Sequence, residues 1–399
     1  MYKAYCRLYQ QTFKLVSPLL PWRKPQLIEG ENAVYKLPKV IKDLGIERVL
    51  IVTDEGITSI GLMNGLLENL KEENLDVAIY DKTVPNPTID NIEDALQLYH
   101  AKHCEGIIAF GGGSPMDCAK GVGARIARPE KIILQMKGEL KVRKKIPPLF
   151  AIPTTAGTGS EATVAAVISN NVTHEKYAIN DMALIPHYAV LDPNLTINLP
   201  PHLTAATGMD ALTHAVEAYI GKSNTDETRQ CSRDAVKLIF DYLPEAYRNG
   251  KNLEARTNMQ KAAYLAGVAF TRAYVGYVHA IAHTLGGFYS IPHGLANAII
   301  LPHVLEYYGE SVHEPLAELA DLINISNATE PIETKAQKFI EAIKNLNKEM
   351  DIPPKVTRIN EDDLPLMVDR AYREANPLYP VPKILSKKEL FTLYQIIKE

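Results

Sequence analysis

The stretch GIIAFGGGSPMDCAKGVG (106–123) joins a short apolar run to a helical pattern through three consecutive glycines. An apolar run of this length, followed by a turn, is typical of a buried strand. Ser114 fits a helix N-cap, Pro115 the first helical position and Asp117 the third. Exposed N–H groups at a helix N-terminus bind phosphate oxygens. The stretch therefore predicts a strand–turn–helix unit in which Gly111–Gly113 approach a phosphate, or alternatively a tight turn without a ligand.

Similar apolar runs, each ending in turn residues, recur on both sides of this unit. They are RVLIVTD (48–54), VAIYDKT (77–83), PLFAIPTTAG (148–157) and YAVLDP (188–193). Helical patterns lie between them, at 62–75 and 89–103. Strands that alternate with helices predict an α/β fold, a parallel sheet with helices on both faces.

The turn PTTAGTGSEAT (153–163) again places small hydroxyl residues and glycines after a predicted strand. Thr154, Thr155 and Thr158 are candidates to contact a phosphate, a ribose or a nicotinamide amide, although an ordinary Ser/Thr-rich loop has the same composition. Asp54 ends the first strong strand and would accept hydrogen bonds from a ribose diol while repelling a 2′-phosphate, which favours NAD over NADP. The alternative for Asp54 is a simple turn residue.

One carboxylate and several imidazoles gather in the second half of the chain. Asp210 and His214 are four residues apart, His279 and His283 are also four apart, and His293 follows in SIPHGLAN. Residues four apart share one face of a helix. Oxygen and imidazole ligands suit Fe(II), Zn(II) or Mn(II). The pattern predicts a catalytic metal site, but the spacing does not choose between His279 and His283.

Two readings explain these residues without a metal. Thr207 precedes Asp210 by three positions, which is the spacing of a helix capping box. A single buried histidine is also more often a hydrogen-bonded core residue than a ligand. Here, however, the candidates all fall between positions 210 and 293 of a chain with 11 histidines. This concentration favours the metal site.

The character of the chain changes near Asn198–Pro201, where strand signals stop and helical periodicity begins. Helical patterns cover 226–250, 255–270 and 331–350. We expect an N-terminal extension at 1–26, an α/β domain at 27–200 with the phosphate-binding candidates, and an all-helical domain at 201–399 with the metal candidates.

Composition excludes several classes of partner. The net charge is −4, from 43 basic and 47 acidic residues, which argues against a nucleic acid or an anionic membrane. No stretch reaches the roughly 20 apolar residues of a membrane helix. The four cysteines lack CxxC spacing, so we expect reduced thiols and a cytoplasmic protein. The first 24 residues lack the apolar core of a signal peptide, and we expect them to pack on the body or on a partner subunit.

Four motifs together resemble the iron-containing, or group III, alcohol dehydrogenases from about Gln26 onward. They are GGGSPMDCAK (111–120), PTTAGTGSE (153–161), LTAATGMDALTHAVEAY (203–219) and VHAIAHTLGG…PHGLAN (278–297). The resemblance implies a dinucleotide-binding α/β domain, an all-helical domain and an active site in the cleft.

The same resemblance implies a role for each candidate residue. It implies that the metal is held by Asp210, His214, His279 and His293 and that His283 lies near the substrate and nicotinamide. It also implies an NAD site made by Asp54, Asn86, Gly112, Gly113, Ser114, Thr154, Thr155, Thr158, Val167 and Lys176.

The function implied is reversible oxidation of a small alcohol or diol to an aldehyde or ketone. The hydride passes to NAD, the alcohol oxygen lies on Fe(II) or Zn(II), and His283 relays the proton. A hydroxyacid–oxoacid transhydrogenase is an alternative, and so is a lyase of the dehydroquinate synthase type, although Arg272 is the one basic residue near the histidine motifs. A homodimer or a higher homo-oligomer is expected, as in related families. Phe270, Tyr274 and Val275 are candidates to line the pocket or to belong to the core.

Overall fold

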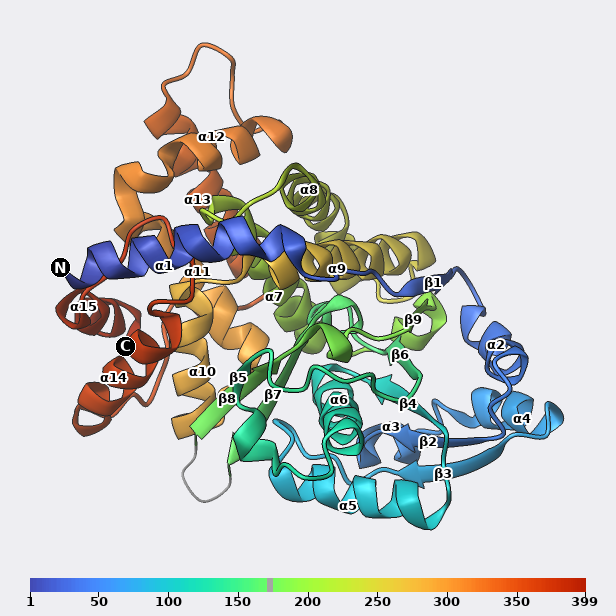
Figure 1. Ribbon diagram of the computed structural model, residues 1–399. Helices are drawn as coiled ribbons and strands as arrows, with labels where there is room; N and C mark the ends of the chain where they lie inside the picture. Colours follow the sequence, from blue (N-terminus) through green and yellow to red (C-terminus); the bar gives the residue numbers. More distant parts are fainter. Residues whose placement is uncertain (171–174) are drawn as a thin grey trace. The chain divides into compact units, whose positions relative to one another are not determined.

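The computed structural model describes residues 1–170 and 175–399 (Figure 1). Contacts divide the chain into two compact units. Pro21–Asn198 form an α/β unit, and Met1–Leu20 join Leu199–Glu399 in a helical unit. The predicted fold class, a parallel sheet flanked by helices plus a helical C-terminal part, is confirmed.

The larger sheet of the α/β unit is parallel, with the strand order β1-β9-β6-β4-β2-β3. Its strands are β1 (Gln26–Glu29), β2 (Arg48–Val52), β3 (Asp76–Tyr80), β4 (Gly106–Gly111), β6 (Leu149–Pro153) and β9 (Tyr188–Leu191). All except β1 coincide with a predicted apolar run. Because β1 lies at the edge and is largely exposed, it lacks the continuous apolar pattern of a buried strand.

A smaller sheet has the order β5-β8-β7, and the sequence patterns did not predict it. Its strands are β5 (Gly138–Glu139), β7 (Ala165–Asn170) and β8 (Glu175–Asn180). β7 pairs antiparallel with β8, and Ser169 bridges to Thr88 in the turn before α5. This sheet therefore brings the residues after the second glycine-rich turn close to the loop that follows β3.

Helices cover both faces of the larger sheet because alternate side chains of each strand point to opposite faces. Val49 and Ile51 pack in one core with residues of α2 and α4, whereas Leu50 and Val52 pack in another with residues of α5 and α6. The helices of this unit are α2 (Leu37–Asp43), α3 (Glu55–Ser59), α4 (Asn64–Glu72), α5 (Ile89–Ala101) and α6 (Gly113–Ala127).

The register of the central strands places the two glycine-rich turns side by side. Gly111, at the end of β4, pairs with Pro153, at the end of β6. The N–H of Thr154 then donates to the carbonyl oxygen of Gly111. Because both strands end at the same edge of the sheet, the turns that follow them share this edge.

The helical unit is built around α7, whose residues are buried from Gly208 to Ile220. Its helices are α1 (Tyr2–Val16), α7 (Pro201–Ile220), α8 (Asp226–Arg248), α9 (Leu253–Ala273), α10 (Tyr277–Tyr289), α11 (His293–Tyr308), α12 (His313–Leu322), α13 (Ile332–Glu349), α14 (Leu364–Ala375) and α15 (Lys387–Ile397). Among the described residues, no helix has both the length and the apolar character that a membrane span requires.

Candidate active site

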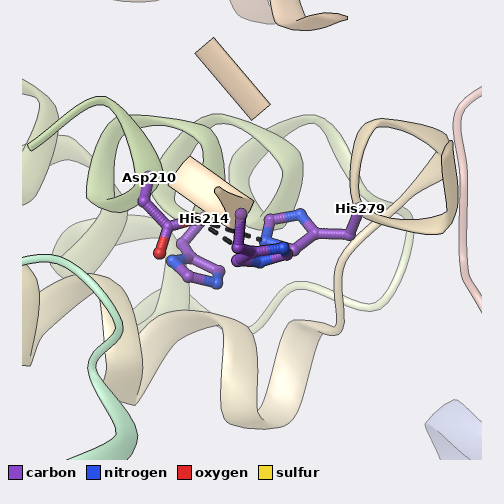
Figure 2. Close-up of side chains that lie close together, drawn as sticks. Asp210, His214 and His279 are labelled. Carbon is purple, nitrogen blue, oxygen red and sulfur yellow. Dashed lines mark ion pairs between the residues drawn. The ribbon is translucent and has the colours of Figure 1, made fainter. Parts of the chain in front are cut away.

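Four side chains from α7, α10 and α11 meet inside the helical unit. Asp210, His214, His279 and His293 each offer a ligand atom, and these atoms all lie within 4.8 Å of one another. The first three side chains are buried and His293 is partly exposed. Figure 2 shows Asp210, His214 and His279 pointing toward one another. The structure therefore brings together the residues that the resemblance selected, and His283 lies outside this set.

Helix geometry explains why these residues meet. Asp210 and His214 lie in the middle of α7 and share one face, since they are four residues apart. His293 opens α11, and Gly294 follows it. A Cβ added at Gly294 would overlap the carbonyl oxygen of Ala206, so the absence of a side chain lets the first turn of α11 approach α7. This close approach places His293 Nε2 3.6 Å from Asp210 Oδ1.

The capping-box alternative for Thr207 and Asp210 is wrong. α7 begins at Pro201, so both residues lie inside the helix rather than at its start. Thr207 donates its hydroxyl to the carbonyl oxygen of Leu203, one turn back. The Asp210 carboxylate is thus directed to the histidine cluster and caps no helix.

Glu217 contacts the imidazole of His279 on the nitrogen that faces away from the cluster. The sequence patterns did not identify Glu217 as a site residue. His279 Nδ1 lies 2.7 Å from Glu217 Oε2, and the N–H groups of Gly276 and Val278 donate to the same carboxylate at 2.8 Å each. Burial raises the pKa of Glu217 to about 8, while these backbone donors act in the opposite direction. Because both carboxylate oxygens already accept N–H groups, Nδ1 is the donor to Glu217. Nε2 of His279 is then the lone-pair atom that faces the cluster.

The protonation state of His279 suits a ligand. Burial lowers its pKa well below the usual range, and the neighbouring imidazoles lower it further. The neutral imidazole is the form that binds a metal. His214, another member of the cluster, stacks on the ring of Phe270, with ring centroids 4.1 Å apart and an interplanar angle of 11°. Phe270 thus contacts the cluster and is not simply a core residue.

Asn297 is a second residue that the sequence reasoning missed. It is fully buried, and its Nδ2 lies 2.7 Å from Asp210 Oδ1, 3.1 Å from His293 Nε2 and 3.3 Å from His279 Nε2. It follows His293 by four positions on α11, so it lies on the same helix face. Glu217 likewise follows His214 by three. Both residues carry the one-turn spacing that identified the ligands, so this signal could have found them.

His283 lies beside the cluster. Its ring stacks on that of His293, with centroids 5.1 Å apart and an angle of 15°. Its Nδ1 lies 2.7 Å from Glu374 Oε1, a residue of α14 that no sequence pattern indicated. Arg272, the basic residue near the histidine motifs, forms an ion pair with Glu227 at 2.6 Å.

In the α/β unit, the helix after the first glycine-rich turn begins two residues earlier than predicted, so Pro115 is its third residue and Asp117 its fifth. The N-cap of α6 is Gly112, which has no side-chain cap, and the helix begins at Gly113. Ser114 is therefore not the N-cap, because its hydroxyl oxygen instead accepts the N–H of Asn86 at 3.1 Å. Asp117 accepts the hydroxyl of Ser160. A helix start without a side-chain cap leaves its first N–H groups to an external acceptor.

Several of the predicted NAD contacts lie together around this turn. Lys176 Nζ donates to Asn86 Oδ1 at 2.6 Å, which joins β8 to the turn after β3. A Cβ added at Gly112 would lie 3.4 Å from Thr155, and one at Gly113 would lie 3.0 Å from Thr158 Cγ2. The two glycine-rich turns and the Asn86 loop therefore form one edge of the unit.

The remaining predicted contacts are placed by the strands. Asp54 caps α3 by accepting the N–H of Ile57 at 3.0 Å, so it has a turn role in addition to any ligand role. Thr154 follows β6, and Val167 lies on β7, where it pairs with Ala178. Val167 therefore lies in the smaller sheet and not on either glycine-rich turn.

A buried lysine fixes the second glycine-rich turn. Lys120 Nζ donates to the hydroxyl oxygen of Ser160, to both oxygens of Thr163 and to the carbonyl oxygen of Ala165, at 2.8–3.0 Å. Burial lowers the pKa of Lys120 to about 8. Burial also raises the pKa of Glu161 to about 7.

Comparisons with known proteins agree with this architecture. The model of the iron-containing alcohol dehydrogenase family matches residues 24–193, and the C-terminal model of the Fe-containing alcohol dehydrogenase family matches residues 204–397. A 1,3-propanediol dehydrogenase of Citrobacter freundii is 38% identical over 370 residues, covering 92% of this chain and 95% of that protein.

Solved structures give the same result. A crystal structure of 1,3-propanediol oxidoreductase has a TM-score of 0.90 at 37% identity and covers 94% of this chain and 99% of that one. A sulfoacetaldehyde reductase from Bifidobacterium kashiwanohense, solved with NAD+, has a TM-score of 0.82 at 27% identity and covers 94% and 98%. The chain belongs to the iron-containing alcohol dehydrogenase family. It is accordingly an oxidoreductase that acts on CH–OH groups.

Proposed function

We propose that this protein is a metal-dependent, NAD-linked dehydrogenase that reversibly oxidises a small alcohol or diol to an aldehyde or ketone. The observation that carries the proposal is the cluster of one carboxylate and three imidazoles with ligand atoms within 4.8 Å of one another. The 1,3-propanediol dehydrogenase relative supports a small diol as substrate. The transhydrogenase and lyase alternatives are not favoured by the relatives, which are named dehydrogenases and reductases of alcohols or aldehydes.

The donor set fits a divalent ion. Metal–ligand bonds of about 2.0–2.2 Å place neighbouring donor atoms roughly 3–4 Å apart. Asp210 Oδ1 lies 3.6 Å from His293 Nε2 and 4.0 Å from His279 Nε2. Asp210, His214, His279 and His293 would hold Fe(II), with Zn(II) as the alternative. The ion would act as a Lewis acid on the substrate hydroxyl, and NAD would accept the hydride.

The residues around the cluster have separable tasks. Glu217 keeps Nε2 of His279 directed at the cluster, and Phe270 stacks on the ring of His214. His283, with its Nδ1 directed at Glu374, accepts the substrate proton at Nε2. These contacts support a site in which the ligands are fixed and the proton acceptor is a separate imidazole.

The α/β unit would bind NAD through the start of α6. Its uncapped N–H groups at Gly113 and Ser114 would donate to the pyrophosphate oxygens, and the absence of a side chain at Gly112 permits a close approach. Asp54, Asn86, Thr154, Thr155, Thr158, Val167 and Lys176 complete the proposed NAD contacts. The relative solved with NAD+ supports this cofactor.

The experiment is a turnover assay on metal-stripped protein reconstituted separately with Fe(II) and with Zn(II). NADH absorbance would be followed on a panel of small alcohols and diols, and on the aldehydes in the reverse direction. We expect turnover of free NAD that depends on the added metal. No turnover with either metal in either direction would contradict the proposal.

We also infer that the chain works as a homo-oligomer in the cytoplasm. The support for oligomerisation is the exposed edge strand β1, whose other side pairs with β9. The support for a reducing compartment is that all four cysteines are free and buried. Light scattering of the purified protein measures the mass, and a value equal to one 44.3 kDa chain would contradict the assembly.

A further inference from the structure

His283 is joined to a carboxylate that fixes which of its nitrogens is protonated. Nδ1 lies 2.7 Å from Oε1 of Glu374, on α14. A carboxylate offers acceptors only, so the bond requires a proton on Nδ1. In the neutral imidazole, Nε2 is then the unprotonated nitrogen. Glu374 therefore selects the tautomer in which Nε2 is able to accept a proton.

Glu374 is itself held in place by Tyr379. The hydroxyl of Tyr379 donates to the same Oε1 of Glu374 at 2.9 Å. Rotation of the Glu374 side chain would break both bonds at once. Tyr379 lies in the connection between α14 and α15, so the position of this connection decides where the carboxylate points.

The N-terminal helix α1 binds this connection through four bonds from side chain to backbone. Gln10 Nε2 donates to the carbonyl oxygens of Pro377 and Tyr379, at 3.0 and 2.7 Å. Arg7 donates to the carbonyl oxygens of Val381 and Pro382, at 2.7 and 2.8 Å. Figure 1 shows α1, in blue, beside the red elements of the C-terminus.

The two side chains that make these bonds also support each other. Arg7 Nη1 donates to Gln10 Oε1 at 2.8 Å, and Gln10 is only 5% exposed. Burial of a polar side chain is favourable only when its hydrogen bonds are made. The Gln10 amide is thus a buried group whose hydrogen bonds to the connection are needed to offset its burial.

α1 makes a second contact, with Tyr274 at the C-terminal end of α9. The ring of Phe13 meets Tyr274 edge-to-face, with centroids 5.5 Å apart, and Tyr274 lies 6.4 Å from Tyr379. Tyr274 ends α9 with φ +64°, a conformation that a bulky residue adopts only where its surroundings hold it. Two residues later, Gly276 donates to Glu217. α1 therefore contacts two segments that hydrogen-bond the carboxylates behind these histidines: the segment of Tyr274 and Gly276, which binds Glu217, and the connection of Tyr379, which binds Glu374.

We propose that Glu374 is a positioning residue for His283 and that α1 keeps Glu374 in place through Tyr379. The inference rests on the proposed function in so far as it assigns proton acceptance to Nε2 of His283. The family models match from residue 24 onward, so α1 lies before the matched region. The contacts that this helix makes with the connection therefore start from outside the segments that the family models match.

The first test reads the tautomer of His283 directly, by NMR of Zn(II)-loaded full-length protein with 15N-labelled histidine. The His283 signals are assigned by their loss in His283→Gln. We expect an Nδ1–H tautomer in the wild type, its retention in Glu374→Gln, whose amide oxygen still accepts, and its loss in Glu374→Ala. Retention in Glu374→Ala would overturn the proposal, and this readout needs no turnover, so it stands apart from failure of the proposed function.

The second test compares kinetics in the same variants. We expect Glu374→Ala to lower kcat by about 100-fold, the effect of displacing a reacting group by about 1 Å, with KM little changed. Glu374→Gln should restore most of kcat. Tyr379→Phe, which removes one hydroxyl, should lower kcat by less and is the variant to use if Glu374→Ala does not fold. A change confined to KM or to the melting temperature would overturn the positioning role.

The matched pair Gln10→Ala and Gln11→Ala tests whether α1 helps to position Glu374. Gln10 binds the connection, whereas Gln11 is its exposed neighbour on the same helix. We expect Gln10→Ala to lower kcat several-fold, by less than Glu374→Ala, and to add a second His283 tautomer, while Gln11→Ala changes neither. Identical His283 spectra in the two variants would remove α1 from the proposal.

Discussion

The two units of this protein build their candidate sites from different parts of the chain. In the helical unit, side chains from three helices place ligand atoms within 4.8 Å of one another, and a further carboxylate orients one of them. In the α/β unit, a helix starts at Gly113 with no side-chain cap, so backbone N–H groups would form the proposed binding surface. A site made of side chains fails when one is removed. A site made of backbone tolerates most side-chain changes and responds instead to added atoms.

The largest expected effect follows from removing a ligand. His279→Ala takes away a buried imidazole of the cluster, and we expect the affinity for Fe(II) or Zn(II) to fall by more than the roughly 100-fold that loss of an outer partner can cause. The metal content of the protein, determined after reconstitution and gel filtration, measures this loss of affinity.

His202→Ala is the matched control for this variant. His202 is exposed and lies on α7, the helix that carries Asp210 and His214. It should keep the metal content of the wild type. Equal metal content in His279→Ala would mean that the cluster does not hold the ion.

Glu217→Gln tests the support behind the ligand. Oε1 of Glu217 accepts one N–H group and Oε2 accepts two, so an amide nitrogen faces a donor at either position and at least one bond is lost. We expect metal affinity to fall by about 10- to 100-fold. Competition with a chelating dye measures the affinity. The exposed Glu72→Gln, on α4, should retain it, and wild-type affinity in Glu217→Gln would show that the imidazole is oriented without its partner.

The sequence predicted the side-chain site more fully than the backbone site, for a physical reason. One-turn spacing on a helix is a property of the sequence alone, so Asp210 with His214 could be identified before the fold was known. Glu374 could not, because it reaches His283 from a helix that is distant in the chain. At the glycine-rich turn the strand and helix were predictable. The cap was not, because Ser114 turns to Asn86 in a tertiary contact.

The same reasoning applies to the strands. Buried parallel strands such as β4 carry continuous apolar runs and were predicted. The edge strand β1 and the smaller sheet of β5, β7 and β8 are partly exposed and carry no such run. Their existence follows from pairing with segments far away in the sequence, which local patterns do not record.

Each unit also buries a glutamate, and the two differ in their partners. Glu217 accepts three N–H groups from outside its own residue, whereas Glu161 lies near the Lys120 ammonium. Burial raises the pKa of both, that of Glu217 to about 8 and that of Glu161 from 4.5 to about 7. Between the two values for Glu161 the folded chain holds a proton that the unfolded chain has lost. Stability therefore falls as the pH rises through this window, and above pH 7 the cost of the buried charge is complete.

Glu161→Gln should remove this cost. We expect the variant to be more stable than the wild type at pH 8, by up to about 3 kcal/mol, with the difference vanishing near pH 4.5. Urea unfolding at several pH values measures the free energy. The exposed Glu72→Gln should follow the wild-type profile. A difference that is the same at every pH would show that the effect is packing and not ionisation.

The smallest expected effect is an added methyl group at the backbone site. In Gly113→Ala the new Cβ would lie 3.0 Å from Thr158 Cγ2, so the turn or Thr158 must move away from its present position. We expect the Kd for NADH, measured by fluorescence titration, to rise about tenfold, which is ~1.4 kcal/mol. Metal content should stay unchanged, because the cluster lies in the helical unit.

A second substitution tests whether crowding between the new Cβ and Thr158 causes the loss of NADH affinity in Gly113→Ala. Thr158→Ser removes Cγ2 but keeps the hydroxyl that accepts the N–H of Ser160. The double variant Gly113→Ala with Thr158→Ser should therefore regain most of the lost affinity if displacement of the turn is the cause. If affinity stays low in the double variant, the methyl group itself blocks the cofactor. If Gly113→Ala binds NADH as the wild type does, the start of α6 is not the surface that binds it, and the contrast between a backbone site and a side-chain site fails.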